Sequence, residues 1–298
     1  MVIEKNYIGS DMANEIRIAF IGSSALGLHE LTKHLGFKVV EALCLEKRIT
    51  ADLRQAARQS GIPIETFDWI ADFRKLINRY PVGFIFFIYQ LDMLVPPDLI
   101  DHYSFYNLHR GNLYTNRGPN PEVWAILNGD KQTSLSLHKI NDKIDSGILV
   151  DSYNIKILPT DDTLTIKIKM ERGLPTLITS LHEYLEERRQ GVKIVDGQYY
   201  PWITEADFTI DVENDSFESM DRKIRSQRQY NGAIVYLGDE KKYVVNIEKI
   251  SVGGSYHEEY RIIGDKLEIK CQDKVIIFKM NLNPEYPPPP KFPPAKRV

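Results

Sequence analysis

Short apolar runs alternate with amphipathic stretches along the first third of the chain. The runs have no polar side, as expected of strands covered on both faces; they comprise residues 16–21, 38–45, 63–67, 83–88 and 103–108. The stretches between them have helical spacing and comprise residues 25–35, 51–60 and 69–80. This alternation predicts an α/β fold in which helices cover both faces of a mostly parallel sheet. Ligands of such sheets bind beyond the carboxyl ends of the strands.

The middle of the chain is less regular, with clean apolar–polar alternation in two places and a long amphipathic stretch that contains a Gly-Leu-Pro break. Alternation is typical of antiparallel strands, and proline is tolerated in the first turn of a helix but not in its interior. We therefore expect a short helix at residues 119–127, antiparallel strands at residues 134–140 and 147–155, and a helix at residues 162–189 that is broken near Gly173 and Pro175.

Short strand patterns separated by turns begin at residue 232 and predict a small β-rich domain. The final residues are rich in proline and should be extended or disordered. The predicted organisation is an N-terminal extension (1–14), an α/β domain (15–200), a connector (201–231), the β-rich domain (232–282) and the proline-rich tail (283–298).

Composition and charge narrow the class of protein. A chain of 298 residues suits one large and one small domain, and its formal net charge of −3 argues against nucleic acid as the main partner. Residues 1–14 are charged where a signal peptide would be apolar, and the apolar stretch at residues 82–89 is too short to span a bilayer. We therefore expect a cytoplasmic protein without a membrane partner.

The cysteines and most histidines give no sign of a metal site. Cys44 and Cys271 lie far apart in apolar, strand-like segments, so we expect buried, unreactive thiols in a reducing compartment. Among the histidines, those without ligand spacing for zinc are His29, His34, His102, His138, His182 and His257. We interpret these as surface or structural residues and expect no metal, with His138 a slightly stronger candidate for function because it lies in an alternating strand.

The strongest chemical signal is Asn107 and His109 at the end of the last predicted parallel strand. Because they are two residues apart on an extended backbone, their side chains point to the same side. An amide can stabilise an oxyanion and an imidazole can move a proton, and Asp145 in a later loop could orient the imidazole. A turn with a solvent-facing histidine is the alternative interpretation of the pair.

A second candidate is the turn from Gly22 to Gly27, which follows the first strand and opens a helix. Its amides could hold a phosphate at the helix N-terminus, or the glycines could serve only a tight turn. Leu28 and His29 stand where a phosphate-binding P-loop needs Lys and Ser or Thr, and the glycine spacing does not fit a dinucleotide site. Both interpretations stay open.

The residues after His109 carry a specific pattern: Arg117-Gly118, Pro121, Trp124-Ala125-Ile126, Gly129-Asp130 and Asp145-Ser146-Gly147. With this order and spacing, the chain from about residue 15 to 210 resembles the folate-dependent formyltransferases, a family that includes methionyl-tRNA formyltransferase and the sugar N-formyltransferases. One departure is Arg110-Gly-Asn-Leu-Tyr114, where many members have Pro-Ser-Leu-Leu-Pro. It puts the identity of the acceptor in doubt more than the activity.

The resemblance implies a Rossmann-like formyltransferase domain in which Asn107, His109 and Asp145, called the trio below, catalyse formyl transfer from 10-formyltetrahydrofolate without a metal. Asn107 and His109 would stabilise charge on the formyl oxygen, and His109 with Asp145 would move the proton of the attacking amine. Which of the two takes that proton first stays open. The resemblance implies folate contacts from Tyr89, Leu91, Met93, Leu94, Asp142 and Ile144. For the acceptor, cationic contacts could come from Arg110, Arg117 and Lys143, with Gly118 and the Gly22 turn beside them.

For the acceptor we expect a nucleotide-linked amino sugar of surface polysaccharide synthesis, whose base could meet an aromatic surface from Tyr199, Tyr200, Trp202 and Tyr230. Initiator tRNA is the main alternative, but it needs a basic C-terminal domain, and residues 205–280 are nearly balanced in charge. Another small amine, such as glycinamide ribonucleotide or a peptide amine, is a further alternative. A formyl-folate-binding protein without turnover would not need the whole trio. The resemblance also implies that two chains could pair through the C-terminal region as a homodimer.

Overall fold

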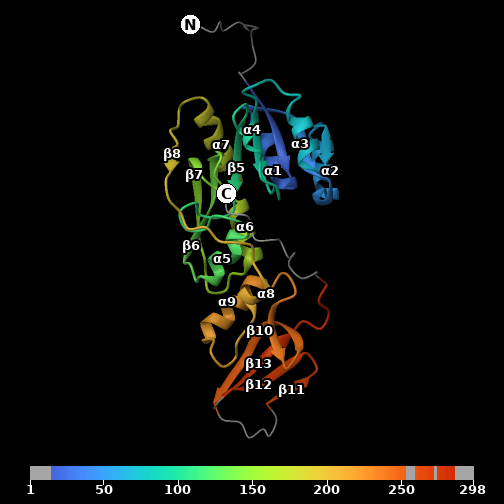
Figure 1. The fold of residues 1–298 in the computed structure, drawn as a ribbon, viewed down its shortest axis with the longest axis vertical. Helices are drawn as coiled ribbons and strands as arrows, with labels where there is room; N and C mark the ends of the chain where they lie inside the picture. Colours follow the sequence, from blue (N-terminus) through green and yellow to red (C-terminus); the bar gives the residue numbers. More distant parts are fainter. Residues whose placement is uncertain (1–14, 253–258, 272–273, 286–298) are drawn as a thin grey trace.

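The computed structural model describes residues 15–252, 259–271 and 274–285. They form an elongated molecule with a large α/β unit at one end and a small β-rich unit at the other (Figure 1). The predicted N-terminal extension and residues 286–298 of the predicted proline-rich tail lie outside the described residues. Within the described ranges, none of the helices combines the length and apolar character needed to cross a membrane.

The large unit is built on an eight-stranded sheet with the order β3-β2-β1-β4-β5-β6-β7-β8. Strands β1 to β5 run parallel, and β6, β7 and β8 are antiparallel additions beyond β5. The predicted parallel sheet and its antiparallel additions are therefore confirmed. The strands are β1 (Ile16–Gly22), β2 (Phe37–Leu45), β3 (Ile64–Phe67), β4 (Ile85–Tyr89), β5 (Ser104–His109), β6 (Gln132–Lys139), β7 (Gly147–Lys156) and β8 (Val192–Ile194).

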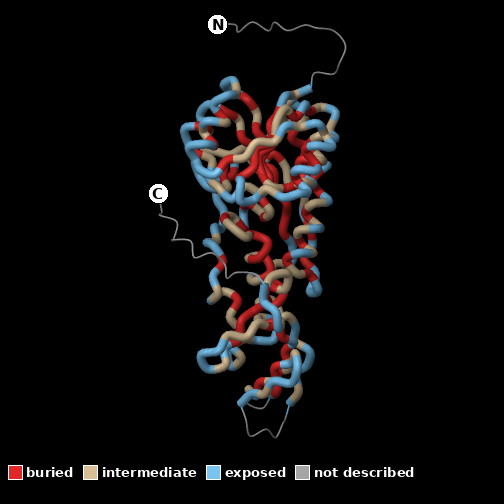
Figure 2. The backbone as a smooth tube through the Cα atoms, turned by 90° about the vertical axis from the view of Figure 1, so that its right-hand side faces the viewer, coloured by how far each residue is buried: buried red, intermediate tan, exposed pale blue. Residues whose placement is uncertain are grey.

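Helices cover both faces of this sheet. One face carries α1 (Ala25–Lys33), α2 (Ala51–Gln59), α6 (Thr163–Glu171) and α7 (Leu174–Leu185), and the other carries α3 (Ile70–Ile77) and α4 (Pro97–Ile100). Strand β1 contributes side chains to the apolar cores on both faces of the sheet. Ile18 and Phe20 face the first layer of helices, and Ala19 and Ile21 face the second. This two-sided burial is why the strand is apolar from Ile18 onward, with its one charged residue, Arg17, exposed near its start. Figure 2 shows the buried residues gathered in the centre of the large unit.

The predicted long helix is two helices, α6 and α7, and the chain breaks at Gly173 as expected. A Cβ on Gly173 would overlap the ring of Tyr153 on β7, so a residue without a side chain lets the backbone pass this close to the sheet. Pro175 then lies in the first turn of α7, where its missing N–H costs no helical hydrogen bond.

The small unit is a five-stranded antiparallel sheet with the order β11-β12-β13-β10-β9, which confirms the predicted β-rich region. Its strands are β9 (Ala233–Leu237), β10 (Glu240–Val252), β11 (Tyr260–Ile263), β12 (Lys266–Cys271) and β13 (Lys274–Met280). Helix α9 (Phe217–Gln227) packs Met220 and Ile224 on this sheet. A further apolar cluster joins the small unit to α5 (Pro121–Leu127) and α8 (Glu205–Phe208); its buried members are Val123, Ile203, Phe208 and Ile234.

The two cysteines have different surroundings. Cys44 is fully buried in β2, where burial raises the pKa of its thiol to about 11, as expected of an unreactive core thiol. Cys271 is only half-buried, because it lies at the very end of β12. The prediction of a buried thiol is confirmed for Cys44 and wrong for Cys271.

Candidate active site

The carboxyl ends of β1, β4 and β5 lie side by side, since Gly22 pairs with Tyr89 and Tyr89 pairs with Leu108. Asn107 and His109 are therefore at the edge where sheets of this kind bind ligands. The loop between β6 and β7 brings Asp145 to this edge, with 3.5 Å between His109 Nδ1 and Asp145 Oδ1. The fold thus gathers the trio from two distant segments of the chain.

His109 is buried, and both of its ring nitrogens face oxygen atoms. Nε2 lies 2.7 Å from the carbonyl oxygen of Asn116, and Nδ1 faces the Asp145 carboxylate. A carbonyl and a carboxylate can only accept hydrogen bonds, so an N–H on either ring nitrogen has an acceptor. The ring is placed to hold a proton beside a carboxylate, as a proton shuttle must.

Asp145 is held by the backbone of the Arg117-Gly118 motif. The Gly118 amide donates to Asp145 Oδ2 at 2.6 Å. Gly118 has a φ of +94°, and a Cβ there would overlap the carbonyl oxygen of Tyr200. Glycine is therefore required both for the backbone conformation and for space, which gives this position of the motif a physical reason.

Packing also explains the glycine in the segment that departs from the family pattern. A Cβ on Gly111 would lie 2.8 Å from His109 Nε2 and 2.7 Å from the carbonyl oxygen of Asn116. The Gly111 carbonyl in turn accepts from Ser136 Oγ at 2.7 Å. This loop therefore shapes the hydrogen bond between His109 and Asn116, a contact that the sequence motifs do not predict.

His138 on β6 lies closer to the trio than its pattern in the sequence predicts. It is fully buried, with Nε2 3.2 Å from Asn107 Nδ2 and Nδ1 3.0 Å from the carbonyl oxygen of Ser146. Burial lowers the pKa of His138 to about 4, against the opposing effect of Asp145. The register of β5 and β6 sets Asn107 opposite His138. The only signal in the sequence was a histidine at an alternating position of a predicted strand.

Arg110, a predicted acceptor contact, follows His109 and reaches an ion cluster on α5 and α6. Its Nη2 lies 3.3 Å from Oε1 of Glu122, and Lys167 Nζ lies 3.5 Å from the same oxygen. Burial alone would raise the pKa of the Glu122 carboxyl, but Arg110 and Lys167 hold it below its ordinary value. A buried carboxylate therefore anchors Arg110, whose side chain remains 27% exposed.

The other predicted acceptor contacts lie on the segments that carry or contact the trio. Arg117 donates from Nε to the carbonyl oxygen of Leu113 at 2.7 Å and so braces the loop after His109. Lys143 is exposed on the loop that carries Asp145. Tyr199 lies against Gly118 and is 41% exposed. Three of the four predicted base-stacking aromatics are on the segment that follows β8, and the fourth, Tyr230, lies beside Lys167; the three are Tyr199, Tyr200 and Trp202.

The predicted folate segments flank one apolar cluster. Leu91 and Met93, after β4, pack against the same buried cluster as Ile140, before the Asp145 loop. Leu94 and Ile144 are 65% and 42% exposed, and Asp142 is exposed as well. Tyr89 is fully buried, so its side chain faces the protein interior rather than the surface of this segment.

For the segment from Gly22 to Gly27, the structure favours a tight turn over a phosphate site. Gly22 has a φ of +143°, and a Cβ there would overlap the carbonyl oxygen of Tyr89. The Ser23 amide donates to the Gln90 carbonyl at 3.3 Å, and the Gly27 amide donates to Ser24 Oγ at 3.0 Å. Two of the amides that a phosphate would need are therefore occupied.

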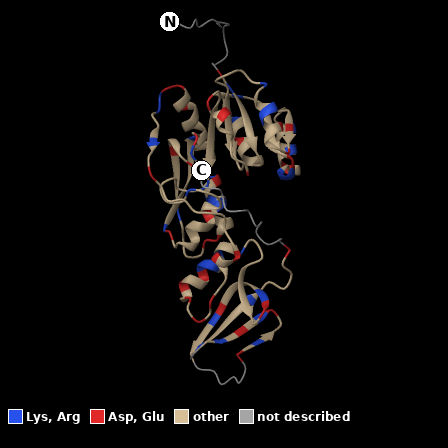
Figure 3. Cartoon of the chain, viewed as in Figure 1, with Lys and Arg blue, Asp and Glu red and all other residues tan. Residues whose placement is uncertain are grey.

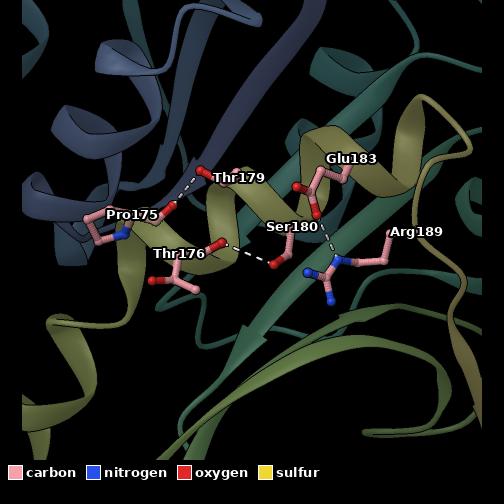
Figure 4. A pocket seen from close by; sticks show the side chains of 6 residues that line it. All are labelled: Pro175, Thr176, Thr179, Ser180, Glu183 and Arg189. Carbon is pink, nitrogen blue, oxygen red and sulfur yellow. Dashed lines mark hydrogen bonds and ion pairs between the residues drawn. The ribbon is translucent and has the colours of Figure 1, made fainter.

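A hollow of about 420 Å³ lies elsewhere, on helix α7; it is lined by Pro175, Thr176, Thr179, Ser180, Glu183 and Arg189 (Figure 4). Three of its polar side chains already have partners, since Arg189 Nε donates to Glu183 at 3.1 Å and Ser180 Oγ donates to Asp151 at 2.6 Å. None of the trio lines it.

In the ranges that the structure describes, there is no group of three or more His, Cys, Asp and Glu able to hold a metal ion.

Known proteins share this fold and arrangement of units. The sequence matches no protein-family model. The bifunctional polymyxin resistance protein ArnA from Wigglesworthia glossinidia brevipalpis is 29% identical over 269 residues, covering 84% of this chain and 40% of that protein. HypX from Aquifex aeolicus, in complex with tetrahydrofolic acid, has a TM-score of 0.62 at 14% identity, covering 89% of this chain and 43% of HypX. The N-formyltransferase from Helicobacter canadensis, in complex with folinic acid and dTDP-3-aminofucose, has a TM-score of 0.65 at 16% identity, covering 89% of this chain and 100% of that one.

The fold is therefore that of the folate-dependent formyltransferases, an α/β domain followed by a small β-rich one. The resemblance to this family, which the sequence motifs indicate, is confirmed. The similarity in sequence to ArnA supports it as well. The chain spans less than half the length of ArnA and of HypX.

Proposed function

We propose that the protein transfers the formyl group of 10-formyltetrahydrofolate to the free amine of a nucleotide-linked amino sugar. The observation that carries the proposal is the trio at the end of β5, where His109 lies between the Asp145 carboxylate and the Asn116 carbonyl. The N-formyltransferase from Helicobacter canadensis, which shares the fold, binds folinic acid and dTDP-3-aminofucose. A role in surface polysaccharide synthesis is part of this proposal.

The trio supplies the groups that formyl transfer to an amine requires. The amine nitrogen forms a bond to the formyl carbon, and negative charge develops on the formyl oxygen, where an Asn107 N–H can donate. The attacking nitrogen must lose a proton, and the folate nitrogen gains one as its bond to the formyl carbon breaks. His109, kept beside Asp145, passes a proton between these two nitrogens. The folate supplies the formyl group, and the other roles belong to the chain.

The surface beside the trio suits a flat, polar ring such as a pterin. Residues 91–95 make no backbone–backbone hydrogen bond within the described part of the chain, so their N–H and C=O groups can serve a ligand. The exposed side chains of Leu94 and Ile144 provide apolar area on the two segments concerned. Recognition through the backbone fits the roles expected of Leu91, Met93 and Asp142, whose side chains differ widely in chemistry.

An acceptor that carries phosphate suits the cations near the trio. Arg110 follows His109 directly, and its guanidinium has the planar donor geometry that phosphates bind. The exposed ring of Tyr199 beside Gly118 offers a stacking surface for a base. We propose Arg110, Arg117, Gly118 and Lys143 as the acceptor side of the site.

The small unit disfavours tRNA as the acceptor. Its cations and those of α9 are mostly paired with carboxylates: Lys223 with Asp215, Arg225 with Asp221, Lys241 with Glu205, Lys266 with Glu248, and Arg261 with Glu268. Figure 3 shows the two signs of charge interspersed over these strands. Cations that are paired in this way offer less positive charge to a nucleic acid backbone than the face of a basic domain does.

The test follows release of tetrahydrofolate from 10-formyltetrahydrofolate with a panel of amines. The panel contains dTDP- and UDP-linked amino sugars, methionyl-tRNA and glycinamide ribonucleotide. We expect turnover with at least one nucleotide sugar. Turnover with charged tRNA or glycinamide ribonucleotide alone would contradict the acceptor, and folate binding without turnover on any amine would contradict the enzymatic proposal.

Replacing the carboxylate of the trio tests the mechanism separately. Asp145→Asn keeps an oxygen for the Gly118 amide but removes the charge that faces His109, so we expect kcat to fall by about 10²- to 10⁴-fold. The matched control is Asp101→Asn, an exposed position before β5, which should change kcat by less than about twofold. Near-normal turnover by Asp145→Asn would exclude the proposed proton transfer.

A further inference from the structure

The surroundings of His138 fix which of its ring nitrogens carries the proton. Nδ1 lies 3.0 Å from the carbonyl oxygen of Ser146, and a carbonyl can only accept. Nδ1 must therefore be the donor. Burial lowers the pKa of His138 to about 4, so the ring is neutral near pH 7 and Nε2 has a free lone pair.

This protonation state decides the orientation of the Asn107 side chain. The two ends of a carboxamide have nearly the same shape, and only their hydrogen-bond partners distinguish them. The end that lies 3.2 Å from His138 Nε2 faces a lone pair, so it must be the NH2 group. The NH2 group has a second N–H, which stays available to another acceptor.

We propose that His138 is a positioning residue, which accepts a hydrogen bond from Asn107 and thereby keeps an N–H rather than the carbonyl oxygen of Asn107 directed at the formyl oxygen. The inference rests on the proposed formyl transfer. Without an acceptor at His138, a half-turn about the Cβ–Cγ bond of Asn107 exchanges its oxygen and nitrogen. The exchanged form sets lone pairs against the developing negative charge and cannot stabilise it.

The neighbours of His138 keep this arrangement constant over the neutral pH range. The charged or titratable groups that face the ring are Asp145, His109 and Arg117. Asp145 favours a protonated ring, whereas His109 and Arg117 disfavour it, and burial has the largest effect. Protonation of Nε2 would turn it into a donor and force Asn107 to present its oxygen, so a buried, neutral histidine is what the role requires.

A double-mutant cycle distinguishes this role from a merely structural one. His138→Leu should lower kcat by about 10²-fold, the loss typical of one oxyanion donor, and leave the KM for 10-formyltetrahydrofolate within about twofold. In an Asn107→Ala background, His138→Leu should cause no further loss, because the group that it orients is gone. Multiplicative losses would overturn the proposal. His138→Gln, whose side-chain oxygen can accept from Asn107, should recover kcat to within about tenfold of wild type.

The matched control is Thr133→Val, another buried polar residue of β6 at the far end of the strand, which should leave kcat unchanged. Thermal unfolding of each variant, followed by circular dichroism, checks that kcat is compared among folded proteins. Retention of kcat by folded His138→Leu would overturn the proposal.

A spectroscopic measurement on the wild-type protein needs neither a variant nor turnover. Long-range ¹H–¹⁵N spectra between pH 8 and pH 5 should show His138 as the neutral Nδ1–H tautomer throughout. An Nε2–H tautomer or an imidazolium at pH 7 would overturn the inference. If the tautomer is as expected but no amine is formylated, the proposed function fails while the Asn107–His138 hydrogen bond stands, so the two failures are distinguishable.

Discussion

At the scale of single residues, two histidines on neighbouring strands have opposite surroundings. His109 faces a carboxylate and a carbonyl, so a proton on either ring nitrogen has an acceptor. His138 faces a carbonyl on one side and the NH2 group of Asn107 on the other, and so suits the form with one proton. His109 is therefore placed to transfer a proton, whereas His138 is placed to keep its single proton on one ring nitrogen.

The neutral state of His138 makes a prediction about stability and pH. Burial takes the pKa of His138 from 6.5 to about 4 on folding, so between these values the unfolded chain binds a proton that the folded protein does not. The free energy of unfolding should therefore be unaffected by this group above about pH 6.5 and fall as the pH drops from there towards 4. His138→Gln removes this contribution.

Urea unfolding at pH 7.5 and pH 4.5 measures the effect. We expect the free energy of unfolding of the wild type to fall more than that of His138→Gln, by on the order of 2 kcal/mol. The comparison of the two falls cancels the contribution of every other titrating group. Equal falls for the two proteins would show that His138 is not buried in its neutral form.

At the scale of elements, the site depends on connections as much as on strands. Strand β5 presents Asn107 and His109. The loop after it supplies the Asn116 carbonyl, which contacts His109, and the Gly118 amide, which contacts Asp145. These backbone groups are fixed by the path of the loop and by the bridge from Arg117 to Tyr199. If this loop were slightly displaced, the trio would stay at the same edge of the sheet, but its side chains would lose the backbone contacts that align them.

Gly118→Ala tests this dependence. At a φ of +94°, a side chain is strained, and its Cβ would overlap the Tyr200 carbonyl, so the loop must move and the Gly118 amide must leave Asp145. We expect kcat to fall by at least about tenfold and the protein to lose about 1–3 kcal/mol of stability. Kinetics of tetrahydrofolate release and urea unfolding measure the two effects.

Gly83→Ala is the matched control, because Gly83 has a similar φ of +85° but has no atom within 4 Å of the added Cβ. It lies before β4, at the opposite end of the sheet from the trio. It should lose about 1 kcal/mol of stability from backbone strain alone and keep its kcat. Equal losses of kcat in both variants would show that strain, rather than the position of the loop, matters.

The elements and part of the site could be predicted from the sequence. Strands buried on both faces are mainly apolar, so β1, β4 and β5 are visible as apolar runs in which the few polar residues stand out, and the parallel sheet follows from the helices between them. Asn107, His109 and Asp145 stand out through side chains and motif spacing. The contributions of Asn116 and Gly118 come from backbone groups, which any residue carries. His138 meets Asn107 only through the register of β5 and β6, and register is not a local property of either strand.

At the scale of the whole molecule, the two units share a core. Val123 on α5 of the large unit packs with Phe208 and Ile234 of the region that follows it. Polar contacts reinforce the joint, since Thr163 Oγ1 donates to the Ser226 carbonyl at 2.7 Å. Trp124 Nε1 donates to the Pro201 carbonyl at 2.9 Å and its ring stacks on Tyr200. Neither unit can unfold without exposing part of this joint.

We therefore expect the two units to unfold together, and Phe208→Ala to destabilise both. Phe208 is 3% exposed within the shared cluster, and truncating such a side chain to alanine costs about 3–5 kcal/mol. Tryptophan fluorescence reports on the large unit and the joint through Trp69, Trp124 and Trp202, and far-ultraviolet circular dichroism reports on all elements. The two signals should give one coincident urea transition in the wild type, and this transition should move to lower urea as a whole in Phe208→Ala.

Val252→Ala, at an exposed position of β10, should leave the midpoint nearly unchanged. Separate transitions for the two signals, or a shift in only one of them, would show that the units are independent and that the joint does not couple the small unit to the sheet that carries the trio.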